Sequence, residues 1–551
     1  MDTTDIIAQI LKREGIKYLS CFPTTSIIEA AAKAGIRPII CRQERVGVGI
    51  ADGYSRITNG NPLGVFAMQY GPGAENAYSG IATAFSDSTP LLLLPLGHPT
   101  HRQRVFPLYN AMDSFATVNK QIEQITASDT TDQVFRRAFA ALRSGRGGPV
   151  TVELPIDIAS HEVSEESFFW PANITPALSQ GNPRDVEEAA KILCAAKYPV
   201  IHAGQGVLYG QASDELVELA ELLGVPVMTT LLGKSAFPEV HPLALGTGSR
   251  VMPGPVYHFV RRSDVMFGIG CSFTKHGMSM NIPTDKTLIH STNDPRDINK
   301  DYDVAHSIVG DSKLVLLQMI EACKEIIGSE SNRKEFYNNT AKEIKTEEQG
   351  WISQWTGKLN DKMRPISPYA VINGFMQAVP PQDAIITHDS GSPRDQITPF
   401  YKSNGARTYI GWGKSHGLGT GLGLIIGAKL ADPEKVCVNF MGDAAFGMVG
   451  LDFETAVRSD IPIITVVLNN STMAVETRQM ADSHQLYRTR DLGGNYADMA
   501  KAMGGYAERI EDPNDIIPAF QRARKKTEEG TAVLLEFITT AETEDSIRNP
   551  F

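Results

Sequence analysis

The chain has 551 residues, of which 42% are hydrophobic and 21% charged, and its formal net charge at pH 7 is −11. This balance is typical of a soluble globular protein long enough for three or four domains. The acidic balance without a basic block disfavours nucleic-acid binding, and no apolar run reaches the ~18 residues that a membrane span needs. The start of the chain predicts an amphipathic helix rather than a secretory signal. Six scattered cysteines without a CxxC pair favour buried free thiols in a reducing cytoplasm over a disulfide framework or a zinc site.

Residues 1–165 predict a first α/β domain. Its apolar runs predict strands separated by helices, as in a doubly wound parallel sheet. The strands are expected at residues 18–22, 37–41, 63–69, 91–96 and 150–154. Glu44 follows the second of them, where a carboxylate with few partners would have a raised pKa. The plainer alternative is a surface glutamate paired with Arg42 or Arg45.

Two further α/β domains are predicted, at residues 186–340 and 360–540. Residues 160–185 are irregular and contain several prolines, which predicts a linker. Strands of the middle domain are expected at residues 200–203, 225–229, 265–269 and 287–290, and residues 329–350 predict a charged helix and linker. The fold class is therefore α/β, with three doubly wound parallel-sheet domains. The first and third domains show the same alternation of strands and helices. This agrees with two related domains that flank a third one.

The stretch from residue 441 to residue 473 carries the strongest pattern in the third domain. Strands are expected at 436–440 and 461–468, with a helix over 448–459 between them. Asp443 and Asn470 then stand at the carboxyl ends of two strands, where such sheets bind ligands. Their oxygens suit Mg²⁺ or Ca²⁺, and the small residues Gly442, Ala444 and Ala445 let backbone N–H groups approach a phosphate. The alternative is an ordinary crossover with Asp and Asn as turn residues.

The spacing of this stretch resembles a known cofactor signature. The 24 residues between Ala444 and Asn469 match thiamine diphosphate (ThDP) enzymes, in which Gly-Asp-Gly precedes Asn-Asn by about that distance. Residues 442–447, Gly-Asp-Ala-Ala-Phe-Gly, are similar to the oxalyl-CoA decarboxylase and 2-hydroxyacyl-CoA lyase branch. The resemblance implies that the Asp443 and Asn470 side chains and the Thr472 carbonyl hold Mg²⁺, with Met473 also at the cofactor.

The first domain resembles the pyrimidine-binding domain of the acetolactate synthase superfamily. Three segments carry the likeness. Residues 42–47 resemble the family's Arg-His-Glu-Gln-Gly-Ala, residues 51–56 resemble Ala-x-Gly-Tyr-Ala-Arg, and residues 71–76 resemble Gly-Pro-Gly-Ala-x-Asn. The resemblance implies that Glu44 is the catalytic glutamate, which hydrogen-bonds the pyrimidine ring. It also places four residues at the cofactor: Pro23, Gly71, Pro72 and Asn76.

Two segments of the third domain extend the resemblance. By comparison with the family, Ser390, Gly391 and Ser392 wrap the diphosphate. The segment Gly417-Leu418-Gly419 resembles the family's Gly-Leu-Gly-x-Met-Gly, and it implies that Leu418 is the bulky apolar residue that keeps the cofactor bent. His416 lies beside this segment; a lone loop histidine is usually structural, and proton transfer is the alternative.

Departures from the family pattern gather on the expected substrate side. Gln43 stands where the family has a His before the glutamate, and Pro23-Thr24-Thr25 stands where it has Pro-Gly-Gly. Residues 108–113 replace the family's Phe-Gln-Glu. We therefore expect the substrate to meet Thr24, Gln43, Gln69, Asn110 and His416. In the middle domain, which in some members binds FAD or ADP, residues 273–276 lack the arginine of the flavin-binding members, so neither nucleotide is favoured.

The resemblance implies a ThDP- and Mg²⁺-dependent decarboxylase or carboligase (a transferase or lyase) acting on a 2-oxo acid, with an acetolactate synthase-like layout. One alternative is a 2-hydroxyacyl-CoA lyase or oxalyl-CoA decarboxylase type with an acyl-CoA substrate. Another is a non-catalytic regulatory subunit, which should have lost Glu44 or the metal ligands. Relatives share each site between two subunits, so we expect a cytoplasmic homodimer or homotetramer with no nucleic-acid or membrane partner.

Overall fold

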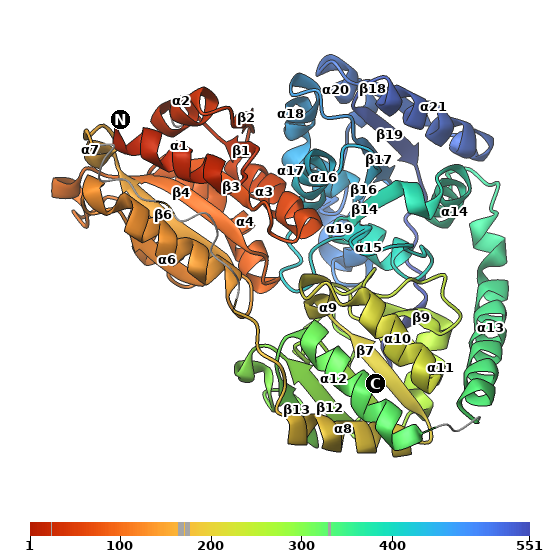
Figure 1. Cartoon of the computed structure of the whole chain (residues 1–551). Coiled ribbons are helices and arrows are strands. Elements are labelled where there is room, and N and C mark those ends of the chain that lie inside the picture. Colours follow the sequence, from red (N-terminus) through yellow and green to blue (C-terminus); the bar gives the residue numbers. More distant parts are fainter. Residues whose placement is uncertain (24, 164–169, 171–176, 329–331) are drawn as a thin grey trace.

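The structure is a computed structural model that describes residues 1–23, 25–163, 170, 177–328 and 332–551. It contains three six-stranded parallel sheets, each flanked by helices (Figure 1). The predicted fold class is therefore confirmed. No helix of the described residues is long and apolar enough to cross a membrane.

The first sheet has the order β2-β1-β3-β4-β6-β5. Its inner strands β3, β4 and β6 are buried at every residue, as the inner strands of a parallel sheet covered on both faces are. The strands are β1 (Tyr18–Cys21), β2 (Arg37–Ile40), β3 (Gly64–Met68), β4 (Leu91–Gly97), β5 (Gln121–Gln124) and β6 (Pro149–Pro155). The helices are α1 (Thr3–Arg13), α2 (Thr25–Lys33), α3 (Glu44–Thr58), α4 (Pro72–Ser86), η1 (Thr100–Arg102), α5 (Ala111–Phe115), η2 (Ser128–Thr130), α6 (Thr131–Arg143) and α7 (Ile156–Ala159).

The middle sheet has the order β13-β12-β11-β7-β8-β9. Its strands are β7 (Pro199–Ala203), β8 (Val227–Thr229), β9 (Ala244–Thr247), β11 (Val265–Ile269), β12 (Thr287–Thr292) and β13 (His306–Val309). Its helices are α8 (Pro183–Ala195), α9 (Gln205–Tyr209), α10 (Ser213–Leu223), α11 (Gly254–Arg262), η4 (Pro295–Asp297) and α12 (Ser312–Ile327). The long helix α13 (Asn332–Leu359) then runs along the outside to the third sheet (Figure 1).

The third sheet, β15-β14-β16-β17-β19-β18, repeats the strand order of the first. Its strands are β14 (Ala384–His388), β15 (Tyr409–Ile410), β16 (Val436–Gly442), β17 (Ile464–Asn469), β18 (Tyr506–Ile510) and β19 (Val533–Ile538). Its helices are α14 (Pro368–Ala378), η5 (Pro381–Asp383), α15 (Ser392–Ile397), α16 (Thr420–Ala431), α17 (Asp443–Val449), η6 (Gly450–Asp452), α18 (Phe453–Arg458), η7 (Ala474–Arg478), α19 (Ala481–Tyr487), α20 (Tyr496–Ala502), η8 (Pro513–Asp515) and α21 (Ile516–Glu528). The first and third domains therefore have the same topology, as their shared alternation predicted.

Two local predictions were wrong. The helix expected over 448–459 begins at Asp443, because Gly442 ends β16 in extended backbone and serves directly as the N-cap of α17. It is then interrupted by η6. The third domain was also predicted to end at residue 540 with no strand beyond it, whereas β20 (Ile547–Arg548) pairs antiparallel with β10 (Val251–Met252) of the middle domain.

The tail that carries β20 is held on the middle domain by side-chain contacts. Ser546 Oγ donates to the Met252 carbonyl (2.8 Å) and accepts from Trp351 Nε1 (3.0 Å). The Phe551 ring stacks on Tyr257 with centroids 5.7 Å apart. The chain therefore ends against the middle domain rather than over the third (Figure 1).

Helices α3 and α16 pack directly against each other and join the first domain to the third. Glycines make the close approach possible: a Cβ on Gly53 would lie 2.1 Å from the Leu424 carbonyl oxygen, and one on Gly427 would lie 2.0 Å from that of Ile50. No side chain fits at either position. The small residues of α3 and α16 thus permit the tight packing of the two helices.

Candidate cofactor site

The carboxyl ends of β14 and β16 form one candidate site. Strand order in the third sheet reverses between these two strands, and ligands of open α/β sheets bind at such a switch point. The turn after β14 carries Asp389 to Ser392, and Asp443 follows β16 directly. The fold thus brings together two segments that were predicted to hold the same diphosphate.

Asp443 is buried, and only one of its two carboxylate oxygens is hydrogen-bonded. Its Oδ1 accepts a hydrogen bond from Ala444 N (2.8 Å), while its Oδ2 is buried without a hydrogen-bond partner. Burial raises the pKa of Asp443, and the backbone N–H groups of Ser471 and Asn470 lie close enough to oppose that rise. An orphaned carboxylate oxygen beside Asn470 is the arrangement that a divalent cation would satisfy.

The other predicted metal and diphosphate residues lie around Asp443. Asn470 Oδ1 accepts from Thr472 N (3.1 Å), so these two residues are joined, and Met473 N donates to the Arg490 carbonyl (2.9 Å). Ala444 and Ala445 form the first turn of α17. A Cβ on Gly442 would meet only Pro393, at 3.9 Å, so the space over the start of α17 is open. The residues therefore fit a diphosphate with its metal ion.

Asp389, which the sequence reasoning did not single out, organises the turn after β14. It is fully buried, and burial raises its pKa to about 6. Its carboxylate accepts hydrogen bonds from three backbone N–H groups: Ser390 (2.7 Å), Gly419 (2.8 Å) and Gly421 (2.9 Å). The turn containing Ser390, Gly391 (φ +93°) and Ser392 is thereby fixed to the start of α16, where Gly417 and Leu418 lie.

Glu44 is the first residue of α3 and is only 5% exposed. Burial raises its pKa, and the Asn76 side chain hydrogen-bonds its carboxylate. Arg42 pairs with Glu454 instead (2.8 Å), and the Arg45 side chain reaches the Leu418 carbonyl. The alternative of a surface glutamate paired with either arginine is therefore wrong.

A buried ionic cluster clamps the segment that leads to Leu418. Arg56 Nε donates to Asp52 (2.6 Å), its Nη2 pairs with Asp87 (3.0 Å), and its Nη1 donates to the Gly411 carbonyl (2.6 Å). Asp87 in turn accepts from the backbone N–H groups of Gly413 (3.0 Å) and Lys414 (3.1 Å). Asp52 and Arg56 belong to the family-like segment 51–56, so that motif holds the third domain's loop against the first domain.

The residues predicted to meet the substrate differ in their burial and in their hydrogen bonds. Gln43 is the N-cap of α3 without a capping bond, and its Oε1 is buried without a partner. Asn110 instead caps α5, accepting from Asp113 N (3.2 Å). Gln69 is exposed, and so is His416, which has a φ of +41° and lies 6.0 Å from the Trp412 ring. Thr24 lies outside the described residues.

The loops of the first domain hold three residues that the sequence predicted at the cofactor and one residue that it missed. Gly71, with φ +63°, precedes Pro72 at the start of α4, and Pro23 is exposed after β1. His98 follows β4; its ring lies 4.8 Å from that of Tyr70, and its Nε2 is buried without a hydrogen-bond partner. Only its place after a predicted strand could have pointed to it.

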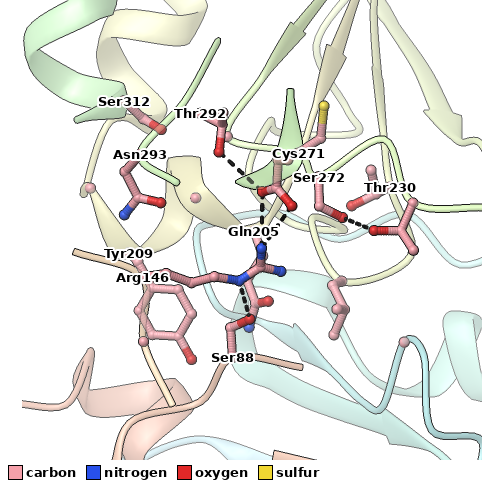
Figure 2. Close-up of a pocket in the computed structure, with 18 of the residues that line it drawn as sticks. Ser88, Arg146, Gln205, Tyr209, Thr230, Cys271, Ser272, Thr292, Asn293 and Ser312 are labelled. Atoms are coloured by element: carbon pink, nitrogen blue, oxygen red, sulfur yellow. Dashed lines mark hydrogen bonds and ion pairs between the residues drawn. The ribbon is translucent and has the colours of Figure 1, made fainter. Parts of the chain in front are cut away.

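A separate cavity of about 620 Å³ lies against the middle domain, and residues of the first domain together with Gly413 and Lys414 of the third also line it. It opens at the carboxyl ends of β7 and β11, where the order of the middle sheet reverses. Figure 2 shows its polar lining, which includes Gln205, Ser272, Asn293 and Ser312. The volume is in the range of small-molecule and nucleotide sites.

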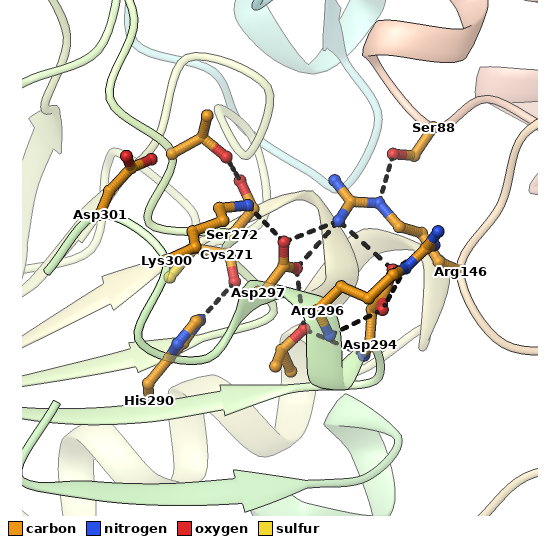
Figure 3. A network of polar contacts seen from close by, with 12 residues as sticks. Ser88, Arg146, Cys271, Ser272, His290, Asp294, Arg296, Asp297, Lys300 and Asp301 are labelled. Atoms are coloured by element: carbon orange, nitrogen blue, oxygen red, sulfur yellow. Dashed lines mark hydrogen bonds and ion pairs between the residues drawn. The ribbon is translucent and has the colours of Figure 1, made fainter. Parts of the chain in front are cut away.

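One wall of this cavity is an ionic network from two domains (Figure 3). Arg146 of the first domain donates to both oxygens of Asp297 (2.9 Å each) and to Ser88 Oγ (2.8 Å). Lys300 also binds Asp297 (2.5 Å). The arginine charge is thus already compensated by the protein.

The comparisons with known proteins agree with the three sheets. Sequence models of thiamine pyrophosphate enzymes match in three parts: the N-terminal TPP-binding domain at residues 1–123, the central domain at 186–319 and the C-terminal TPP-binding domain at 389–537. A probable acetolactate synthase large subunit of Methanococcus aeolicus is 30% identical over 95% of this chain and 90% of its own length. That of Methanocaldococcus jannaschii is 30% identical over 94% and 88%, and the Escherichia coli K12 isozyme 3 large subunit is 27% identical over 97% and 94%.

A match of this length and identity establishes the family, and the cofactor follows from the two TPP-binding domains. The chain belongs to the thiamine diphosphate-dependent enzymes of the acetolactate synthase superfamily.

Proposed function

We propose that this enzyme decarboxylates a 2-oxo acid and joins the remaining acyl group to the carbonyl carbon of an acceptor, with Mg²⁺ as the metal. In that reaction one carbon–carbon bond breaks to release CO₂, another forms, and the new alkoxide takes up a proton. The named activity of the relatives, acetolactate synthase, supports this class. Thiamine diphosphate supplies the nucleophilic carbon and the electron sink.

The protein residues have separate roles in this proposal. Glu44, whose pKa is raised by burial, would hydrogen-bond a ring nitrogen of the bound cofactor. Asp443, Asn470 and the Thr472 carbonyl hold Mg²⁺ at the start of α17. Leu418 supports the cofactor between these two groups. The buried Glu44 without an ion pair is the observation that carries the proposal.

The decisive experiment measures CO₂ release with ThDP and Mg²⁺ over a panel of 2-oxo acids, with acyl-CoA thioesters in parallel. Release from a simple 2-oxo acid together with a ligated product supports the proposal. Turnover of an acyl-CoA alone would place the enzyme in the lyase branch, which the similarity of residues 442–447 favours. Binding of ThDP without turnover of any substrate would favour a non-catalytic subunit.

We propose a homodimer or homotetramer in the cytoplasm. The family resemblance implies that two copies share each site, whereas α3 and α16 pack within one chain here. Mixing inactive Glu44→Gln and Asp443→Ala chains distinguishes the arrangements. Random pairing restores about a quarter of wild-type activity if each site draws on two copies, and none if one chain supplies both residues.

The middle-domain cavity is a second ligand site in this proposal, with FAD disfavoured. In residues 273–276, His276 replaces the arginine of the flavin-binding members. The charge of Arg146 is already neutralised by Asp297. The absorption spectrum of the purified protein tests this: a flavin band would contradict it. Thermal unfolding with and without ADP tests the smaller nucleotide.

A further inference from the structure

Two cysteines of the middle domain have neighbouring thiols. Cys194 lies near the end of α8 and Cys323 lies in α12, and these two helices pack against each other (Figure 1). The Cys323 S–H donates a hydrogen bond to the Cys194 sulfur. Cys194 is partly exposed, whereas Cys323 is fully buried. The pair therefore combines one thiol that solvent can reach with a second thiol directly behind it.

Cys194 also lies beside a cation. Arg333, near the start of α13, donates from Nη2 to the Cys194 backbone carbonyl (2.9 Å). The hydrogen bond from Cys323 and the charge of Arg333 lower the pKa of Cys194, against the opposing effect of burial. The same hydrogen bond, together with burial, raises the pKa of Cys323. Cys194 is thus the thiol of the pair that loses its proton, and the thiolate is the form that reacts with oxidants.

The other four cysteines lack this combination. Each is buried, and burial raises its pKa; they are Cys21, Cys41, Cys271 and Cys437. Cys21 and Cys41 are the closest comparison, because they too lie side by side, with Cys41 N donating to the Cys21 carbonyl (2.9 Å). Their exposed fractions are only 0% and 1%, so neither thiol of that pair is open to solvent.

We propose that Cys194 and Cys323 form a reversible oxidation site for hydrogen peroxide. The Cys194 thiolate attacks one peroxide oxygen and the O–O bond breaks. The leaving hydroxide takes up a proton, so Cys194 becomes a sulfenic acid and one water is released. The Cys323 sulfur then attacks the Cys194 sulfur. The S–S bond forms, the S–O bond breaks, and the Cys323 proton leaves with the hydroxyl group as a second water.

The reaction is balanced by the peroxide alone. The two thiols lose two electrons in total, the peroxide gains them, and a dithiol reductant restores both thiols. The disulfide would close a long loop of the middle domain, which restricts the unfolded chain and stabilises this domain. Because both cysteines lie outside the two TPP-binding domains, the site is independent of the proposed cofactor roles.

The test exposes the wild-type protein to hydrogen peroxide in neutral buffer and digests it without reduction. Mass spectrometry identifies linked peptides, and dimedone traps sulfenic acid. Iodoacetamide labelling of the untreated protein gives the alkylation rate of each cysteine. Cys323→Ala and Cys194→Ser are compared with the wild type, and Cys21 with Cys41 is the matched control within the same chain. The thermal midpoint establishes that each variant is folded.

We expect Cys194 to be alkylated at least about tenfold faster than Cys21. Peroxide should link Cys194 to Cys323 with the loss of two hydrogen atoms and should raise the thermal midpoint, and dithiothreitol should reverse both changes. In Cys323→Ala the oxidation should stop at a dimedone-reactive sulfenic acid, and in Cys194→Ser the Cys323 thiol should survive. Equal alkylation rates, a sulfinic acid at Cys194 without the linked peptide, or a link between Cys21 and Cys41 instead would each overturn the proposal.

Discussion

The buried cluster of Asp52, Arg56 and Asp87 predicts a large and specific cost when Arg56 is replaced by methionine. Arg56 is only 6% exposed, and burial lowers its pKa while the two carboxylates raise it beyond its usual value. Methionine would fill much of the aliphatic volume but leave both carboxylates without their cation. Breaking a buried pair in this way costs about 3–5 kcal/mol. Since Asp87 keeps the N–H groups of Gly413 and Lys414, we expect the lower end, about 3 kcal/mol.

Urea unfolding of the ligand-free protein, followed by tryptophan fluorescence and far-UV circular dichroism, measures this loss. The chain has three domains, so the transition to compare is the one in which the first domain unfolds. The triple variant Asp52→Asn/Arg56→Met/Asp87→Asn removes the stranded charges and should regain part of the stability. A loss below about 1 kcal/mol in Arg56→Met, or a triple variant less stable than the single one, would refute the reasoning.

Four further outcomes are expected. Glu44→Gln should lower turnover at least about 100-fold while ThDP still binds, and near-wild-type CO₂ release would contradict its role. Asp443→Asn should stay inactive when Mg²⁺ is returned after chelation, whereas the wild type recovers; equal recovery would remove Asp443 from the metal site. Gly53→Val should lower the free energy of unfolding by at least about 1–3 kcal/mol, because its Cβ would overlap the Leu424 carbonyl, and an unchanged urea midpoint would argue against the α3–α16 contact. Burial raises the pKa of Asp389 from 3.8 to about 6, so the native state binds this proton more tightly than the unfolded state, and stability should fall as pH rises from about 4 to about 6. Asp389→Asn should flatten that slope in pH-dependent unfolding, and an unaltered slope would assign it to other groups.

The inner strands and the cofactor motif were predictable because they are local patterns, whereas edge strands such as β5, β9 and β13 were not expected. Parallel strands are covered on both faces, so they appear as short apolar runs such as 91–96 and 265–269. The residues after them, including Asp443 and Asn470, stand out as polar breaks. The start of α17 was misplaced because its first turn consists of small residues without helical periodicity.

What could not be predicted depends on contacts between distant segments. Nothing near Asp389 in the sequence shows that it accepts hydrogen bonds from Gly419 and Gly421. The partner of Arg45 lies 373 residues away, and the cavity wall joins Arg146 to Asp297 across 151 residues. Such pairings depend on how whole domains pack together, and a local sequence pattern does not show that packing.

The tail that ends on the middle domain has a mechanical consequence. Helix α13 and the segment after β19 are two separate covalent crossings between the same two domains, and both are held by packing. Separating the middle and third domains would therefore require breaking the β10–β20 pairing and the hydrogen bonds of Ser546, in addition to the direct contact of Ser403 with Glu239. A fusion partner attached after Phe551 would start beside the Phe551–Tyr257 ring stack and would strain this second link between the domains.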